Sequence, residues 1–235
     1  MAAVEEVEHR RYERSLNRAR VLTLSDGVFA IAMTLLVLEL RVPERTVTVS
    51  PVDVLREIRP SFIAFLISFF VIASAWANQR DLFEVIRLTD RNLVWLNVVY
   101  LLPLTMIPFG AALLSRYGSD RVSLTIYGGL LLAIALMRLV IWLYATSRPH
   151  LLFEPVGREL RRAGVLLVIV PITLYVVAIV LAQVGNIEQD VSLVIYALVP
   201  VLYFATIIFT PPQLRPFLEH TPEGDAGSGD GTSGD

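Results

Sequence analysis

The stretch RVLTLSDGVFAIAMTLLVLEL, from Arg20 to Leu40, decides the fold class of this chain. It is apolar almost throughout, and a helix needs about 20 such residues to cross the hydrocarbon layer of a bilayer. Ser25 and Asp26 lie in its first turns. A helix capped by Ser25 would keep only about 15 residues, or roughly 22 Å, and that is too short. We therefore expect the helix to begin upstream, with Asp26 inside it and facing protein rather than lipid.

The rest of the chain has the same apolar character. Hydrophobic residues make up 55% of its 235 residues, with a mean hydropathy of +0.62, and charged residues only 18%. A soluble domain is usually about 45–50% apolar. The sequence thus predicts an all-α integral membrane protein with six transmembrane helices per chain. The six predicted spans are residues 20–41, 58–79, 92–114, 122–145, 163–184 and 190–210.

The two ends of the chain are hydrophilic and differ in charge. Residues 1–19 carry arginines and no apolar core with a cleavage site, so we expect a cytoplasmic N-terminal segment rather than a signal peptide. Residues 20–212 form the predicted transmembrane domain. Residues 213–235 are acidic and rich in Gly and Ser, which is typical of a disordered tail. The predicted loops that share a side with both termini hold 13 arginines against 6 opposite, which places both termini in the cytoplasm.

Polar side chains at similar depth are predicted to form one layer between the first four spans. Asp26 is expected to pair with Arg138, or with an Arg20 from another helix, because Arg20 and Asp26 lie about 240° apart around their own helix. A purely structural role, with Arg138 extending toward the interface, is equally compatible with the sequence. The other groups at this level are Trp76, Gln79 and Asn97.

An aliphatic stripe follows one face of the first span. Val28, Ile31, Leu35, Leu38 and Val42 recur at steps of three and four residues. Packing against another span is the plainest explanation of such a stripe. Neither a TVGYG filter nor a ring of acidic residues at mid-membrane depth is present to build a familiar pore.

The placement of reactive side chains argues against an enzyme. His9, His150 and His220 all fall outside the predicted spans, and the chain has no cysteine. No Ser-His pair, metal-ligand cluster or phosphate-binding loop can be assembled within the membrane. We expect no cofactor and no nucleic-acid partner. A proton leak is also disfavoured, because no histidine lies within a span to relay protons.

A secondary transporter for a small solute is the alternative to a channel. Transporters usually contain helices broken at mid-membrane, and Pro103, Pro108, Pro171 and Pro200 interrupt the predicted spans three, five and six. The first span is unbroken, however, and the chain shows no pair of matching halves.

The run from Arg20 to Glu39 resembles the signature of the transmembrane protein 175 family. These proteins are potassium-permeable channels, lysosomal in animals and in the plasma membrane in bacteria. The family pattern is Arg, three residues, then Phe-Ser-Asp, and Leu24 stands here in place of Phe. Trp76, Trp95-Leu96-Asn97 and Pro108-Phe109 resemble the second and third spans of the family. Gln79 and Arg80 stand where the family often has a histidine after that tryptophan.

The resemblance implies a homotetramer in which the first helix of each subunit lines a central pore. By motif position, the aliphatic rings that constrict family pores fall on Ile31, Leu35 and Leu38, with Thr34 supporting them. The implied function is a potassium-permeable channel with modest selectivity for K⁺ over Na⁺, gated by dewetting of the constriction. Glu39, near the outer end of this helix, is expected to raise the local cation concentration. The implied partners are the lipid bilayer and permeant monovalent cations. K⁺ is the implied permeant ion, and no cofactor is expected. The implied polar layer comprises Arg20, Ser25, Asp26, Trp76, Asn97 and Arg138.

Overall fold

The computed structural model describes residues 2–40, 51–118, 120–153, 157–184 and 186–209, and their regular structure is helical. The elements, in chain order, are α1 (Ala2–Leu35), the 3-10 helix η1 (Leu36–Glu39), α2 (Pro51–Val85), α3 (Arg91–Thr105), α4 (Ile107–Tyr117), α5 (Arg121–Thr146), the 3-10 helix η2 (Pro149–Leu151), α6 (Arg158–Val184) and α7 (Asn186–Phe209).

Most of these helices are long and apolar enough to cross a membrane. Five stretches of the described chain meet both criteria, with α3 and α4 acting together as one span, and a sixth, Val191–Phe204 of α7, is apolar but shorter. The prediction of an all-α membrane protein is therefore confirmed. The five longer stretches are Asn17–Glu39, Val52–Val85, Arg91–Tyr117, Arg121–Thr146 and Arg161–Val184.

Several helices extend beyond their predicted spans, and α1 and α2 do so furthest. α1 begins at Ala2, so the predicted N-terminal segment and the first span form one continuous helix, and Asp26 lies inside it as expected. α2 runs from Pro51 to Val85 and passes both ends of the predicted 58–79 span. The predicted tail, residues 213–235, lies outside the described residues.

The prolines affect their helices unequally. The third span breaks at Met106, whose amide bonds to the carbonyl of Pro103 at 3.2 Å, and Pro108 lies in the first turn of α4. The predicted interruption is therefore confirmed there. The interruption predicted at Pro171 and Pro200 is wrong, because α6 and α7 continue through these residues. A single proline removes only one helical hydrogen bond, and packing against neighbouring helices tolerates that loss.

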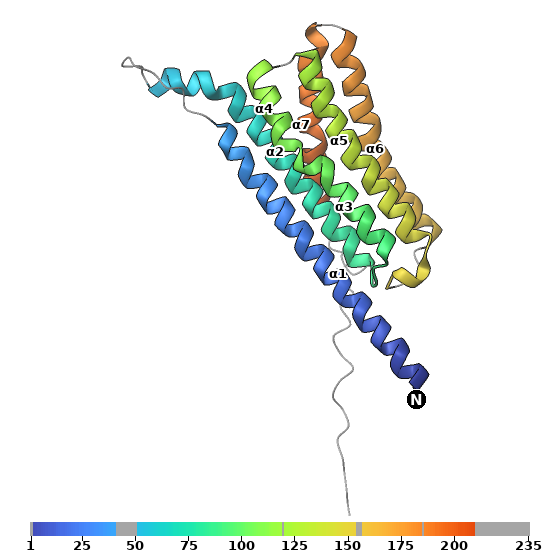
Figure 1. Ribbon diagram of the computed structural model, residues 1–235. Helices are drawn as coiled ribbons and strands as arrows, with labels where there is room; N and C mark the ends of the chain where they lie inside the picture. The colour runs from blue at the N-terminus through green and yellow to red at the C-terminus, as the bar shows by residue number, and fades with distance from the viewer. Residues whose placement is uncertain (1, 41–50, 119, 154–156, 185, 210–235) are drawn as a thin grey trace, which may run out of the picture.

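The helices form an elongated bundle with α1 along one side (Figure 1). α5 packs against α3, α4 and α6, α6 packs against α7, and α1 packs against α2, α3 and α4. The N-terminal part of α1 extends past the end of the bundle (Figure 1). We call this the basal end.

Two connections meet at the basal end and form what we call the basal cap, residues 85–88 and 151–153. The amides of Arg87 and Leu88 both donate to the carbonyl of Leu151, at 2.8 and 3.1 Å. The amide of Phe153 donates to the carbonyl of Val85 at 3.2 Å. The α2–α3 and α5–α6 connections therefore lie together, as an alternating up-and-down arrangement of spans requires.

Candidate functional site

One face of α1 and its continuation η1 packs into the bundle. Val21, Ser25, Phe29, Ala32 and Leu36 are all buried and recur at steps of three and four residues. The ring of Phe29 lies 6.5 Å from that of Tyr100 in α3. This face fixes the rotation of α1 about its axis, and hence which side chains the chain leaves uncovered.

The three predicted constriction residues lie on the uncovered face. The side chains of Ile31, Leu35 and Leu38 are 60%, 43% and 62% exposed. Val28, from the same predicted stripe, is half-buried against the core, and Val42 falls outside the described residues. Packing against another span of the same chain therefore does not account for Ile31, Leu35 and Leu38. These side chains meet lipid, a pore or another copy of the chain.

Thr34 and Glu39 flank these aliphatic residues. The hydroxyl of Thr34 donates to the carbonyl of Ile31 at 2.9 Å, within its own helix, and the side chain is exposed. The α-helix ends at Leu35 and continues as the 3-10 helix η1, whose last residue is the half-buried Glu39. The predicted roles of Thr34 and Glu39 at the constriction stay predictions.

Three buried side chains, one each from α1, α2 and α3, form a closed hydrogen-bonded triad. Ser25 Oγ donates to the carbonyl of Val21 at 2.8 Å and accepts from Gln79 Nε2 at 3.0 Å and from Asn97 Nδ2 at 2.9 Å. Gln79 Nε2 also donates to Asn97 Oδ1 at 2.5 Å. A hydroxyl offers one donor and two acceptor positions, so Ser25 is fully satisfied. The triad joins α1, α2 and α3 without any charge.

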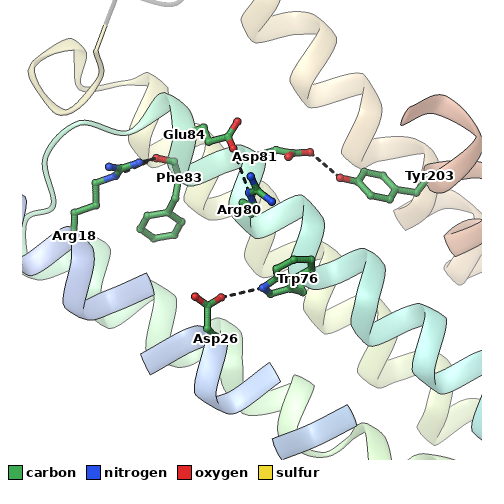
Figure 2. Close-up of polar contacts among 8 residues, drawn as sticks. All are labelled: Arg18, Asp26, Trp76, Arg80, Asp81, Phe83, Glu84 and Tyr203. Atoms are coloured by element: carbon green, nitrogen blue, oxygen red, sulfur yellow. Dashed lines mark hydrogen bonds and ion pairs between the residues drawn. The ribbon is translucent and has the colours of Figure 1, made fainter. Parts of the chain in front are cut away.

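Asp26 has a different partner from the predicted one. Its Oδ1 accepts a hydrogen bond from Trp76 Nε1 at 2.9 Å, as Figure 2 shows. The predicted pairing of Asp26 with Arg138 does not form, because Arg138 donates to Asn78 Oδ1 on the far side of α2. Asp26 contacts protein as expected, yet both Asp26 and Trp76 are exposed on the single chain.

The predicted single polar layer is thus three separate groups. They are the Ser25–Gln79–Asn97 triad, the Asp26–Trp76 pair and the Arg138–Asn78 pair. Arg20, the remaining predicted member, is exposed near the basal end, and its pairing with Asp26 of another copy stays a prediction.

Two further polar contacts of α2 are absent from the sequence-based prediction. Tyr203 in α7 donates to Asp81 Oδ2 at 2.7 Å (Figure 2), and Asn78 holds Arg138. The signal was present, because Asn78 and Asp81 are polar residues close to Gln79 near the end of an apolar span. In the part of the chain that the structure describes, no group of acidic or histidine side chains could hold a metal ion.

Comparison with known proteins identifies the family. The family model described as "Endosomal/lysosomal potassium channel TMEM175" matches residues 20–108. A potassium channel of Chamaesiphon minutus is 39% identical over 60% of this chain and 71% of its own length. A potassium channel of Streptomyces collinus is 34% identical over 58% of this chain and 68% of its own length.

More distant relatives and two solved structures also match this chain. The human endosomal/lysosomal proton channel TMEM175 is 27% identical over 61% of this chain but only 29% of its own length. The crystal structure of a lysosomal potassium-selective channel TMEM175 homolog from Chamaesiphon minutus has a TM-score of 0.71 and 31% identity, covering 80% of this chain and 97% of that one. The structure of the potassium channel MtTMEM175, at 21% identity and a TM-score of 0.55, shares the fold. With helices, signature and relatives in agreement, the chain belongs to the TMEM175 family.

Proposed function

We propose that this protein is a potassium-permeable channel in which four copies surround a pore lined by α1. The observation that carries the proposal is the exposure of Ile31, Leu35 and Leu38. The family resemblance implies by motif position that these residues form the constriction, and the face of α1 and η1 on which they lie is left uncovered by the bundle. The naming of the Chamaesiphon and Streptomyces relatives as potassium channels supports the same function.

The chemistry of an aliphatic ring explains a modest preference for potassium. Ile31, Leu35 and Leu38 offer no oxygen atoms that replace the water around an ion. K⁺ holds its hydration shell less tightly than Na⁺, so it passes a narrow apolar ring at lower cost. When the ring narrows, water leaves it and conduction stops. Selectivity is therefore expected to be weaker than in a filter lined with carbonyl oxygens.

The membrane setting follows from the charges and the relatives. The excess of arginine on the side of both termini supports a cytoplasmic location for the basal end. The Chamaesiphon and Streptomyces relatives support a bacterial plasma membrane. In that orientation Glu39 lies at the outer end of η1, where a carboxylate attracts cations toward the pore.

Recording from purified protein in planar bilayers tests the proposal. With K⁺ on one side and Na⁺ on the other, we expect a reversal potential that shows a modest preference for K⁺. Leu35→Ala should alter conductance or selectivity, whereas Val180→Ala, on an exposed face of α6, should not. Currents indifferent to Leu35→Ala would remove Leu35 from the constriction. An absence of current from folded protein would contradict the channel and favour a transporter.

Proton permeation through the same pore is a second candidate, because the human relative is named a proton channel. The exposed polar side chains along the apolar part of α1 include Arg20, Thr23, Asp26 and Thr34. A pH gradient across the bilayer with equal K⁺ on both sides separates the two ions. A reversal potential near zero excludes substantial proton current, and a shift toward the proton equilibrium potential demonstrates it.

A further inference from the structure

Arg18 connects α1 to the end of α2. Its guanidinium donates from Nη2 to the carbonyl of Phe83 at 2.7 Å and from Nε to the same oxygen at 3.2 Å (Figure 2). The side chain is partly buried, and Glu84 near the end of α2 forms an ion pair with Arg80 at 3.4 Å. Two N–H groups of one rigid fork thus converge on a single backbone oxygen, which fixes the position of α1 more tightly than a flexible ammonium would.

The carbonyl of Phe83 is available because of the basal cap. In a continuing α-helix this oxygen would accept from the amide of Arg87, four residues later. The amide of Arg87 instead donates to the carbonyl of Leu151, in the α5–α6 connection. The cap therefore ends α2 and frees a carbonyl at the negative end of the helix, where a guanidinium is favoured.

The α5–α6 connection also touches Arg18 directly. The guanidinium carbon lies 5.6 Å from the centre of the Phe153 ring, within the range of a cation–π contact. The amide of Phe153 in turn bonds to the carbonyl of Val85. Arg18 is thus in contact with both halves of the basal cap, and through them with α2 and the α5–α6 connection.

We propose that Arg18 is a positioning residue that holds the pore helix against the basal cap, so that movements of the α5–α6 connection reach the pore through α1. This inference rests on the proposed channel function. Arg18 lies on the buried face of α1, about 220° around the helix from Ile31 and about 20 Å below it. It therefore acts on the position of α1 and not on the permeating ion.

A purely structural contact would have a different effect. If Arg18 only stabilises the fold, its loss lowers the unfolding temperature and leaves the balance of open and closed channels unchanged. If it positions α1, its loss changes that balance, while the conductance of an open channel and the reversal potential stay as in the wild type.

Single-channel recording separates these effects. We expect Arg18→Gln to shift the open–closed equilibrium about fivefold or more, with unchanged unitary conductance and reversal potential. Arg18→Lys keeps the charge but not the fork, so an intermediate shift is expected. Phe153→Leu should shift the equilibrium in the same direction and by less, and in combination with Arg18→Gln it should add little. Arg91→Gln removes an exposed arginine at the start of α3 and should behave as the wild type.

A distance measurement tests the proposal independently of conduction. The chain has no cysteine, so Asn17→Cys on α1 and His150→Cys in η2 provide two unique sites for spin labels. Labelled chains are diluted with unlabelled ones, so that pulsed electron paramagnetic resonance reports the distance within one chain. We expect a narrow distance distribution in the wild type and a broader one in Arg18→Gln. If Arg18→Gln does not fold, Arg18→Lys should show the broadening.

The outcomes decide the two proposals separately. A wild type without potassium current contradicts the channel, while the label distances still test the contact. A distribution as narrow in the Arg18 variants as in the wild type overturns the positioning role, whether or not current flows. Normal gating of Arg18→Gln in a conducting protein overturns it as well.

Discussion

Trp76 Nε1 donates a hydrogen bond to Asp26 Oδ1 at 2.9 Å and so joins α2 to α1 on a surface that the single chain leaves exposed. The carboxylate lies at a depth where apolar residues prevail, and a charge there is costly without a polar partner. The indole satisfies one oxygen of Asp26. The geometry therefore makes Trp76 a partner for a charge as well as a packing residue.

Replacing this tryptophan tests that role. Trp76→Phe retains an aromatic ring but removes the donor, so we expect a loss of about 1–3 kcal/mol in the free energy of unfolding. In an Asp26→Asn background, Trp76→Phe should lower the free energy of unfolding by less, because asparagine leaves no full charge without its partner. Thermal unfolding in detergent, measured for both single variants and the double variant, checks the coupling. Equal costs in both backgrounds would contradict it.

The buried triad leads to a second prediction. Ser25→Ala removes the oxygen that accepts from both Gln79 and Asn97, so their N–H groups lose a partner in a buried site. We expect a destabilisation of about 1–3 kcal/mol, measured as a lower unfolding temperature. Thr23→Ala is the matched control, because the hydroxyl of Thr23 is exposed and bonds only to its own helix. A similar effect of both variants would mean that the triad adds nothing specific.

Two adjacent glycines in α5 provide a test of helix packing. A Cβ on Gly128 would overlap Tyr196 of α7 and lie 2.7 Å from Ile179 Cγ1 of α6, whereas a Cβ on Gly129 meets nothing within 4 Å. Gly128→Ala should therefore destabilise the bundle by about 1–3 kcal/mol. Gly129→Ala should be neutral or slightly stabilising, because alanine favours a helix. Thermal unfolding of the two variants side by side gives the comparison, and equal stability would contradict this packing of α5, α6 and α7.

The carboxylate of Glu39 leads to a prediction about salt. If Glu39 attracts cations to the outer end of the pore, Glu39→Gln should lower single-channel conductance at low ionic strength. The deficit should shrink at about 1 M salt, where the Debye length falls to about 3 Å. Conductance measured from about 0.01 to 1 M KCl checks this. A deficit that does not change with salt would assign Glu39 a structural role in η1.

Hydropathy predicts the helices well because the bilayer requires a similar apolar length from each. The break at Met106 follows from Pro103 and Pro108 together, which remove two backbone donors within one short stretch. Pro171 and Pro200 stand alone in their helices, and tertiary packing against neighbouring helices, which the sequence does not display, keeps those helices continuous.

The partners of the polar side chains were harder to predict, because they depend on the rotation of each helix. One residue along a helix turns the side chain by about 100°. The adjacent residues Asn78 and Gln79 therefore point to different neighbours, Arg138 in α5 and the triad with α1. Depth alone placed Asp26 and Arg138 at one level, but α2 lies between them and bonds to both.

The change from α-helix to 3-10 helix after Leu35 has a consequence for the proposed constriction. A 3-10 helix completes a turn in three residues and rises about 2.0 Å per residue, so Leu38 lies directly above Leu35 at a spacing of about 6 Å. In an α-helix the same step would leave Leu38 about 60° out of line and about 1.5 Å closer. Rewinding this single turn as an α-helix would therefore turn the Leu38 side chain by about 60° relative to Leu35 and draw it about 1.5 Å closer, and it would also move the buried Leu36.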